Sequence, residues 1–209
     1  PGTGKTQLAR TLAQEAGCKF IAASTADLKA GWVGQSGQRV KQLFADARSA
    51  APCLLFLDEI DALAGDRSGD SDAFAREALN QMLQEIDGIV DHSDAPVVVL
   101  AATNRMAVID PALLSRFTSK LLIDLPTAAQ RIGLAEHLLA ASPIETAARD
   151  RLHAFLQQAE DYSHRDVANL VQSIRAQVLR GVRATGAASL DDLAVTQHHV
   201  EAAIPANLD

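Results

Sequence analysis

The chain has 209 residues with 26 acidic and 19 basic side chains, which gives a net charge of −7 at pH 7. This length allows one large domain, or one medium and one small domain, with a buried core. The acidic balance, without any cluster of Lys and Arg, argues against a general binder of nucleic-acid backbones, and with no long apolar run and no signal peptide we expect no membrane segment in this sequence.

The chain begins with PGTGKT, which matches the second half of the phosphate-binding pattern G-x-x-x-x-G-K-[ST]. Glycines let successive N–H groups point at phosphate oxygens, and the helix expected over QLARTLAQEAG offers its positive N-terminal end to the same anion. An ordinary turn before a helix is the alternative interpretation. The predicted nucleotide-binding residues are Gly2, Thr3, Gly4, Lys5, Thr6 and Gln7, with Lys5 at the β/γ-phosphates and Thr6 on Mg²⁺. The first glycine of the pattern and the strand that feeds such a loop would precede Pro1, so we interpret the sequence as a fragment.

Short apolar runs alternate with helical patterns up to about residue 126. Continuous apolar runs of this kind are typical of strands buried on both faces of a parallel sheet. The predicted strands are KFIAA (19–23), CLLFLD (53–58), PVVVLAA (96–102) and KLLIDL (120–125), and helical spacings occur at Val40/Leu43/Phe44/Ala47 and Leu79/Met82/Leu83/Ile86. We therefore predict an α/β domain, a parallel sheet flanked by helices, over residues 1–126.

Two adjacent carboxylates, Asp58 and Glu59, follow the strand predicted at CLLFLD. The carboxyl ends of strands face the ligand crevice in a doubly wound sheet, so Asp58 would stand opposite the Mg²⁺ on Thr6. Glu59 could then polarise a water for in-line attack on the γ-phosphate. A solvated acidic strand end is the other interpretation.

Beyond Pro126 the apolar positions keep helical spacing and no further strand is predicted. They fall at Leu152/Phe155/Leu156/Ala159 and at Val167/Leu170/Val171/Ile174/Val178. We predict a small all-helical domain over residues 127–209.

The two cysteines, Cys18 and Cys53, lack the spacing of metal ligands. Cys53 lies in an apolar strand, so we expect small buried hydrophobic residues rather than a disulfide. This favours a reducing compartment, and we expect the cytoplasm.

These segments together resemble an AAA-type ATPase module, most closely the protein-remodelling members. Besides PGTGKT and APCLLFLDEIDAL, the resemblance rests on GWVGQSGQRVKQLFADAR, REALNQMLQEIDG, VLAATNR, IDPALLSRF and YSHRDVANLV, which occur in the family's order. It implies a P-loop NTPase domain followed by a helical lid, with Mg·ATP bound between neighbouring copies in a homo-oligomeric ring, commonly a hexamer.

The resemblance also assigns roles to three polar residues. Asn104 in AATNR matches the residue that holds the attacking water or the γ-phosphate, although an asparagine capping a turn would look the same. Arg116 in LLSRF matches the arginine finger that reaches the neighbouring subunit's γ-phosphate. Many relatives carry a second arginine shortly afterwards, where this chain offers only Lys120, which lacks the guanidinium fork. Arg165 in YSHRDV is either a lid arginine that contacts the γ-phosphate or a solvent-facing residue at a helix start.

A pore loop is implied by GWVGQS, where the family carries an aromatic followed by an aliphatic residue. Here these are Trp32 and Val33, whose apolar surface could grip an extended polypeptide irrespective of its sequence. Trp32 could instead be a core residue. The polar stretch GDRSGDSDAF, residues 65–74, matches a second pore-facing loop and also reads as a linker.

We therefore expect an ATP-driven ring that remodels or translocates a protein substrate, delivered directly or by an adaptor. Two alternatives stay open. A nucleic-acid motor or loader built on the same ATPase core is disfavoured by the acidic charge and by Trp32 and Val33. A nucleotide-gated scaffold with little turnover is disfavoured by the Asp58–Glu59 pair and favoured by the missing second arginine.

Overall fold

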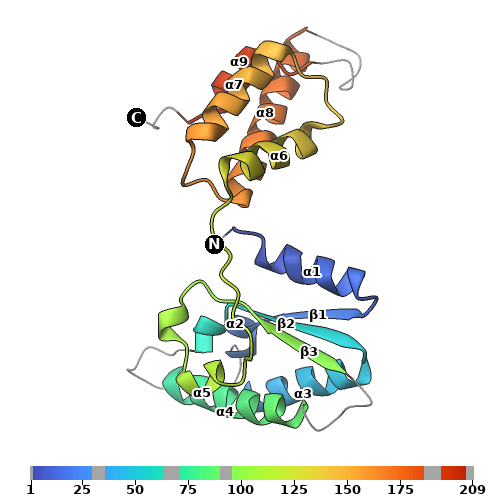
Figure 1. Cartoon of the computed structure of the whole chain (residues 1–209), viewed down its shortest axis with the longest axis vertical. Coiled ribbons are helices and arrows are strands. Elements are labelled where there is room, and N and C mark those ends of the chain that lie inside the picture. The colour runs from blue at the N-terminus through green and yellow to red at the C-terminus, as the bar shows by residue number, and fades with distance from the viewer. Residues whose placement is uncertain (1, 30–35, 64–70, 90–95, 186–193, 206–209) are drawn as a thin grey trace. The chain divides into compact units, whose positions relative to one another are not determined.

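The structure is a computed structural model that describes residues 2–29, 36–63, 71–89, 96–185 and 194–205 (Figure 1). The chain divides into two compact units. One comprises Lys5–Leu122, and the other comprises Pro1–Gly4 together with Ile123–Asp209. The division into a domain of residues 1–126 and a domain of residues 127–209, expected from the sequence, stays a prediction.

The first unit contains a parallel sheet in the order β1-β2-β3. Its strands are β1 (Lys19–Ser24), β2 (Cys53–Asp58) and β3 (Val97–Ala101). The central strand is apolar and buried from its first residue to its fifth, because both of its faces are covered. The α/β fold with a parallel sheet, predicted from these runs, is confirmed.

Side chains alternate between the two faces of β2 and enter two separate cores. On one face, Leu54 and Phe56 pack with alanines of α1 (Lys5–Glu15). On the other, Leu55 and Leu57 pack in a core with residues of α3 (Ser36–Ser49) and α4 (Ser71–Ile89). Figure 1 shows this layering, with α1 on one side of the strands and α3 and α4 on the other.

The described part of the first unit also contains four short helices. They are α2 (Thr25–Lys29), the 3₁₀ helices η1 (Ile60–Leu63) and η2 (Met106–Val108), and α5 (Pro111–Leu114). Two of them, α2 and η1, follow the carboxyl ends of β1 and β2. Because α2 follows β1 directly and packs against η1, the segments after β1 and β2 lie together.

The prediction of a strand at KLLIDL is wrong, since residues 120–125 carry no strand. Leu121 and Leu122 are 77% and 82% exposed. A strand needs a ladder partner, and among the described residues β3 pairs only with β2. An apolar run therefore does not become a strand where no partner lies beside it.

The second unit is built from α6 (Ala128–Leu139), α7 (Thr146–Gln158), α8 (His164–Thr185) and α9 (Gln197–Ala203). These helices share one core, which includes the predicted positions Leu152, Leu156 and Ile174. An isolated bridge between Ile144 and Val195 is the one β pairing among its described residues. The helical character predicted for this part of the chain is confirmed.

Arg131 of α6 is 3% exposed and joins two parts of this unit. Its guanidinium donates to the carbonyl oxygens of Leu156 at 2.9 Å and Pro126 at 2.6 Å. The first acceptor lies near the C-terminal end of α7, where a cation is electrostatically favoured. No described helix of the chain is both long and apolar enough to cross a membrane.

Candidate active site

The predicted phosphate loop contains two glycines with a left-handed backbone. Gly2 and Gly4 have φ angles of +84° and +89°, a left-handed region that glycine enters without steric cost. The helix α1 starts at Lys5, directly after Gly4. The first N–H groups of this 11-residue helix lack intrahelical partners, so its start is suited to an anion.

Two side-chain pairs connect the start of α1 to the carboxyl ends of the strands. The Lys5 Nζ donates to Asn104 Oδ1 at 2.7 Å, and the Thr6 hydroxyl donates to Asp58 Oδ2 at 3.0 Å. Asp58 is the last residue of β2, and Asn104 follows β3. Parallel strands end at the same edge of a sheet, so residues far apart in the sequence meet there.

The oxygen atoms of Thr6 and Asp58 form a donor set that fits Mg²⁺. Mg²⁺ prefers hard oxygen ligands and usually takes one or two from the protein, with the rest from phosphates and water. A hydroxyl and a carboxylate 3.0 Å apart meet that description. Both residues were predicted as metal ligands from the sequence, and that role stays a prediction.

Glu59 has an unusual backbone conformation directly after β2. Its φ is +55°, which no other non-glycine residue in the described part of the chain shares. For a residue with a side chain this region costs roughly 1–2 kcal/mol. The Glu59 N–H donates to Asp58 Oδ1 at 2.9 Å, and the side chain of Glu59 is exposed. The predicted base thus extends into solvent beside the predicted metal ligand.

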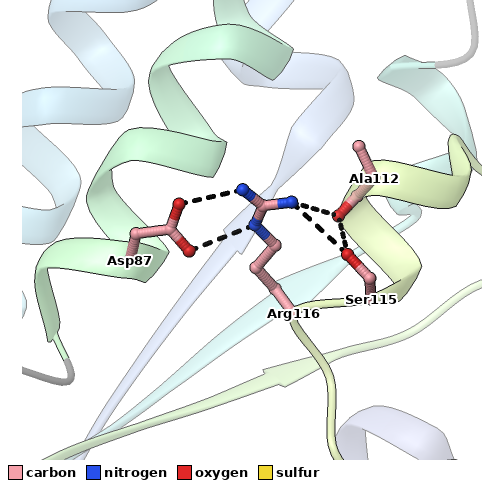
Figure 2. Close-up of polar contacts among 4 residues, drawn as sticks. All are labelled: Asp87, Ala112, Ser115 and Arg116. Atoms are coloured by element: carbon pink, nitrogen blue, oxygen red, sulfur yellow. Dashed lines mark hydrogen bonds and ion pairs between the residues drawn. The ribbon is translucent and has the colours of Figure 1, made fainter.

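Arg116 lies after α5 and is held by the end of α4 (Figure 2). Its guanidinium donates to both carboxylate oxygens of Asp87, at 3.1 and 3.0 Å, and to the carbonyl oxygen of Ala112 at 3.0 Å. The hydrogen bonds between the two side chains lower the pKa of Asp87 and raise the pKa of Arg116. The predicted finger is therefore engaged with a carboxylate of its own chain, while Lys120, its predicted partial replacement, is exposed.

The start of α8 is fixed by a local cap. Ser163 and Asp166 bond reciprocally, with the Ser163 N–H donating to Asp166 Oδ2 at 2.9 Å and the Asp166 N–H donating to Ser163 Oγ at 3.3 Å. The Ser163 hydroxyl also donates to Asp166 and lowers its pKa. This arrangement satisfies backbone donors at the helix start.

Gly2 lies against this cap, within the second unit. The Arg165 N–H donates to the Gly2 carbonyl oxygen at 3.2 Å. A Cβ atom on Gly2 would lie 2.7 Å from Ser163 Oγ and 2.9 Å from Arg165 Cβ. The side chain of Arg165 is exposed, and its predicted role at the γ-phosphate stays a prediction.

Some predicted residues fall outside the described part of the chain. These include Trp32 and Val33 of the predicted pore loop and most of the predicted second loop, residues 65–74. The last four residues of that second loop belong to α4, which begins at Ser71, so the loop prediction is wrong for them. The sequence could have predicted a helix start there, because Ser and Asp favour the N-cap position.

The structure also reveals polar residues that the sequence analysis missed. Asp87 lies in the motif REALNQMLQEIDG but received no role there. The Thr103 hydroxyl donates to Asp61 Oδ1 at 2.8 Å and so joins the segments that follow β3 and β2. Thr25 is fully buried and donates to the backbone carbonyls of Asp58 and Glu59. No local pattern marks these residues, since their partners are 29 to 42 positions away.

Comparisons with known proteins identify the family of the chain. The family model described as "ATPase family associated with various cellular activities (AAA)" matches residues 1–125. The chain is 41% identical over 177 residues to the ATP-dependent zinc metalloprotease FtsH 3 of Sorangium cellulosum, covering 82% of this chain and 29% of that protein. It is 35% identical over 213 residues to the cell division cycle protein 48 homolog of Archaeoglobus fulgidus, covering 98% of this chain and 28% of that protein.

A solved structure has the same fold. The crystal structure of the FIGL-1 AAA domain in complex with ADP has a TM-score of 0.80 and 28% identity, covering 100% of this chain and 70% of that one. The chain spans less than a third of the length of the two curated relatives named above. Since the family model matches more than half of the chain and relatives of 35–41% identity cover most of it, the chain belongs to the AAA family of ATPases.

Proposed function

We propose that this chain is the motor module of a ring-forming protein that hydrolyses Mg·ATP and uses the energy to remodel protein substrates. The observation that carries the ATPase part is the pair of hydrogen bonds at the start of α1, Lys5 to Asn104 and Thr6 to Asp58. They bring the residues expected at the phosphates and at the metal to one edge of the sheet. Glu59 follows directly at the same edge.

Hydrolysis needs a base, a polarised phosphate and a leaving group. Glu59 accepts a proton from the attacking water, whose oxygen bonds to the γ-phosphorus while the bond to the bridging oxygen breaks and ADP leaves. Lys5 binds the β/γ-phosphates, and Asn104 holds the water or the γ-phosphate. Mg²⁺ held by Thr6 and Asp58 neutralises phosphate charge when it is bound.

The proposal includes assembly into a homo-oligomeric ring, with six copies as is common in the family. Arg116 then acts on the nucleotide of a neighbouring copy, where a guanidinium stabilises the charge of the transition state. Support comes from its position after α5, at the end of the IDPALLSRF motif.

A protein substrate is favoured over a nucleic acid by three features. The net charge of −7 opposes a phosphate backbone. Trp32 and Val33 supply an aromatic and an aliphatic side chain at the position of the family's pore loop. One relative is named as an ATP-dependent zinc metalloprotease, and proteases act on polypeptides.

A nucleotide-gated scaffold is the second candidate. The chain lacks the second arginine that many relatives carry shortly after the first and has Lys120 nearby instead, and Arg116 itself is bound to Asp87. A slow turnover in the full-length protein, unaffected by any protein substrate, would favour this candidate.

The test compares Trp32→Ala with Glu59→Gln in the full-length protein. We expect Trp32→Ala to hydrolyse ATP within a few-fold of the parent rate and to lose unfolding of a protein substrate. Glu59→Gln should bind ATP but hydrolyse it about 10²–10⁴-fold more slowly, the usual contribution of a general base.

Two results would contradict the proposal. A Trp32→Ala variant with a lower melting temperature, weaker ATP binding and lost remodelling would make Trp32 a core residue. Stimulation of the parent ATPase by DNA, without stimulation by unfolded protein, would favour a nucleic-acid motor.

A further inference from the structure

Thr25 is the most deeply buried polar side chain in the described part of the chain, with 0% exposure. It is the first residue of α2, directly after β1. Its hydroxyl donates to the carbonyl oxygen of Asp58 at 3.1 Å and to that of Glu59. One hydroxyl proton is therefore shared between two consecutive carbonyl groups.

These two carbonyls flank the Cα atom of Glu59. The Asp58 carbonyl belongs to the peptide whose orientation is set by the φ angle of Glu59, and the Glu59 carbonyl belongs to the peptide set by its ψ angle. A single donor that bonds to both restrains both soft dihedrals of one residue. Thr25 does this from the junction between β1 and α2.

The restrained residue is the one with the left-handed backbone, with φ of +55°. Such conformations persist only where the surroundings determine them from several directions. Besides Thr25, the Ile60 N–H donates to the Ala102 carbonyl at 3.0 Å and the Ala62 N–H donates to the Glu59 carbonyl at 2.8 Å. The Glu59 N–H also donates to Asp58 Oδ1 at 2.9 Å, but Thr25 is the side chain that bonds to the carbonyl groups on both sides of the Glu59 Cα atom.

The direction of the Glu59 side chain depends on this backbone. Among the residues that the structure describes, the Glu59 carboxylate has no hydrogen-bond partner that would aim it. The Cα–Cβ direction is then set by φ and ψ, and a change in either moves the carboxylate. A base must lie within hydrogen-bond reach of the proton it takes.

We propose that Thr25 is a positioning residue that holds Glu59 in the conformation needed to activate water. The proposal rests on the proposed function, in which Glu59 is the base. Thr25 does not touch nucleotide; it acts through the backbone of Glu59.

The test compares Thr25→Val, which keeps the shape and removes the hydroxyl, with Thr25→Ser, which keeps the hydroxyl. The Glu59 carbonyl keeps its bond from the Ala62 N–H, so we expect Thr25→Val to fold. Its kcat should fall by about 10–100-fold, since a misplacement of about 1 Å can cost that much. Its KM for ATP and its Kd for ADP should stay within about three-fold of the parent values. The side chains to which we assign nucleotide and metal binding, Lys5, Thr6 and Asp58, are unaltered in this variant. Thr25→Ser should recover most of the lost kcat.

The same measurement in a Glu59→Gln background separates positioning from a general structural role. We expect Thr25→Val to slow Glu59→Gln no further in single-turnover hydrolysis, because Thr25 acts only through the carboxylate. An equal slowing in both backgrounds, an unchanged kcat in Thr25→Val, or a joint loss of melting temperature and ADP binding would overturn the proposal. If Glu59→Gln itself hydrolyses ATP at the parent rate, the proposed role of Glu59 fails first, and that result is visible without any Thr25 variant.

Discussion

The contact between Gly2 and the start of α8 gives a prediction with a matched control. Both Gly2 and Gly4 have left-handed φ angles, of +84° and +89°. A Cβ on Gly4 would meet no atom within 4 Å, whereas a Cβ on Gly2 would lie 2.7 Å from Ser163 Oγ and 2.9 Å from Arg165 Cβ. Gly4→Ala therefore reports the backbone strain alone, and Gly2→Ala reports that strain plus the steric overlap.

The expected magnitudes follow from these two terms. A left-handed alanine costs roughly 1–2 kcal/mol, which both variants share. Inserting a methyl group where the neighbouring atoms are already closely packed destabilises the folded state by about 1–3 kcal/mol more. Ser163 cannot easily move away, because it is 4% exposed and its hydroxyl bonds to Asp166 at 2.6 Å. Gly2→Ala should thus be less stable than Gly4→Ala by about 1–3 kcal/mol.

Thermal and denaturant unfolding of the nucleotide-free protein measure the difference. At this chain length each kcal/mol lowers the melting temperature by roughly 2–4 °C. Equal destabilisation of the two variants, or a more stable Gly2→Ala, would show that Gly2 does not pack against Ser163 and Arg165 in solution.

Two further predictions concern the predicted finger and the cap of α8. Arg116→Ala should bind nucleotide without hydrolysing it, and co-assembly with Lys5→Ala subunits should restore some ATPase activity; a proven mixed ring without activity would exclude catalysis in trans. Asp166→Asn should be less stable than the parent at pH 7, because the folded-state pKa of Asp166 is lowered chiefly by the Ser163 hydrogen bond. This difference is fully present above the ordinary carboxyl pKa of about 4 and is lost as the pH falls through the lowered value. Melting temperatures of both proteins across that range test it, and a difference that grows on acidification would refute it.

Local sequence patterns were sufficient for much of the fold. The run CLLFLD became β2 over the predicted residues because both faces of that strand are buried. The run KLLIDL, also mostly apolar, did not become a strand, since pairing depends on a neighbouring strand as well as on composition.

The candidate site was predictable only where a motif carries the chemistry. Lys5 pairs with Asn104 and Thr6 pairs with Asp58, all four being residues that motifs singled out, and their roles stay predictions. Thr25 could not be found in this way, because a threonine at a strand end carries no signal and its partners lie 33 and 34 residues further along the chain. Such contacts are set by tertiary packing, which no window of sequence contains.

The bidentate contact of Arg116 with Asp87 determines what a second anion can gain from that arginine. The guanidinium already has an acceptor pair of nearly ideal spacing. In the ring that we propose, a phosphate of another copy would have to displace this carboxylate, so the free energy it gains would be the difference between two similar contacts. Arg116 would then exchange one anion for another between copies, and the free energy of that contact would depend on how well the Asp87 carboxylate is solvated after release.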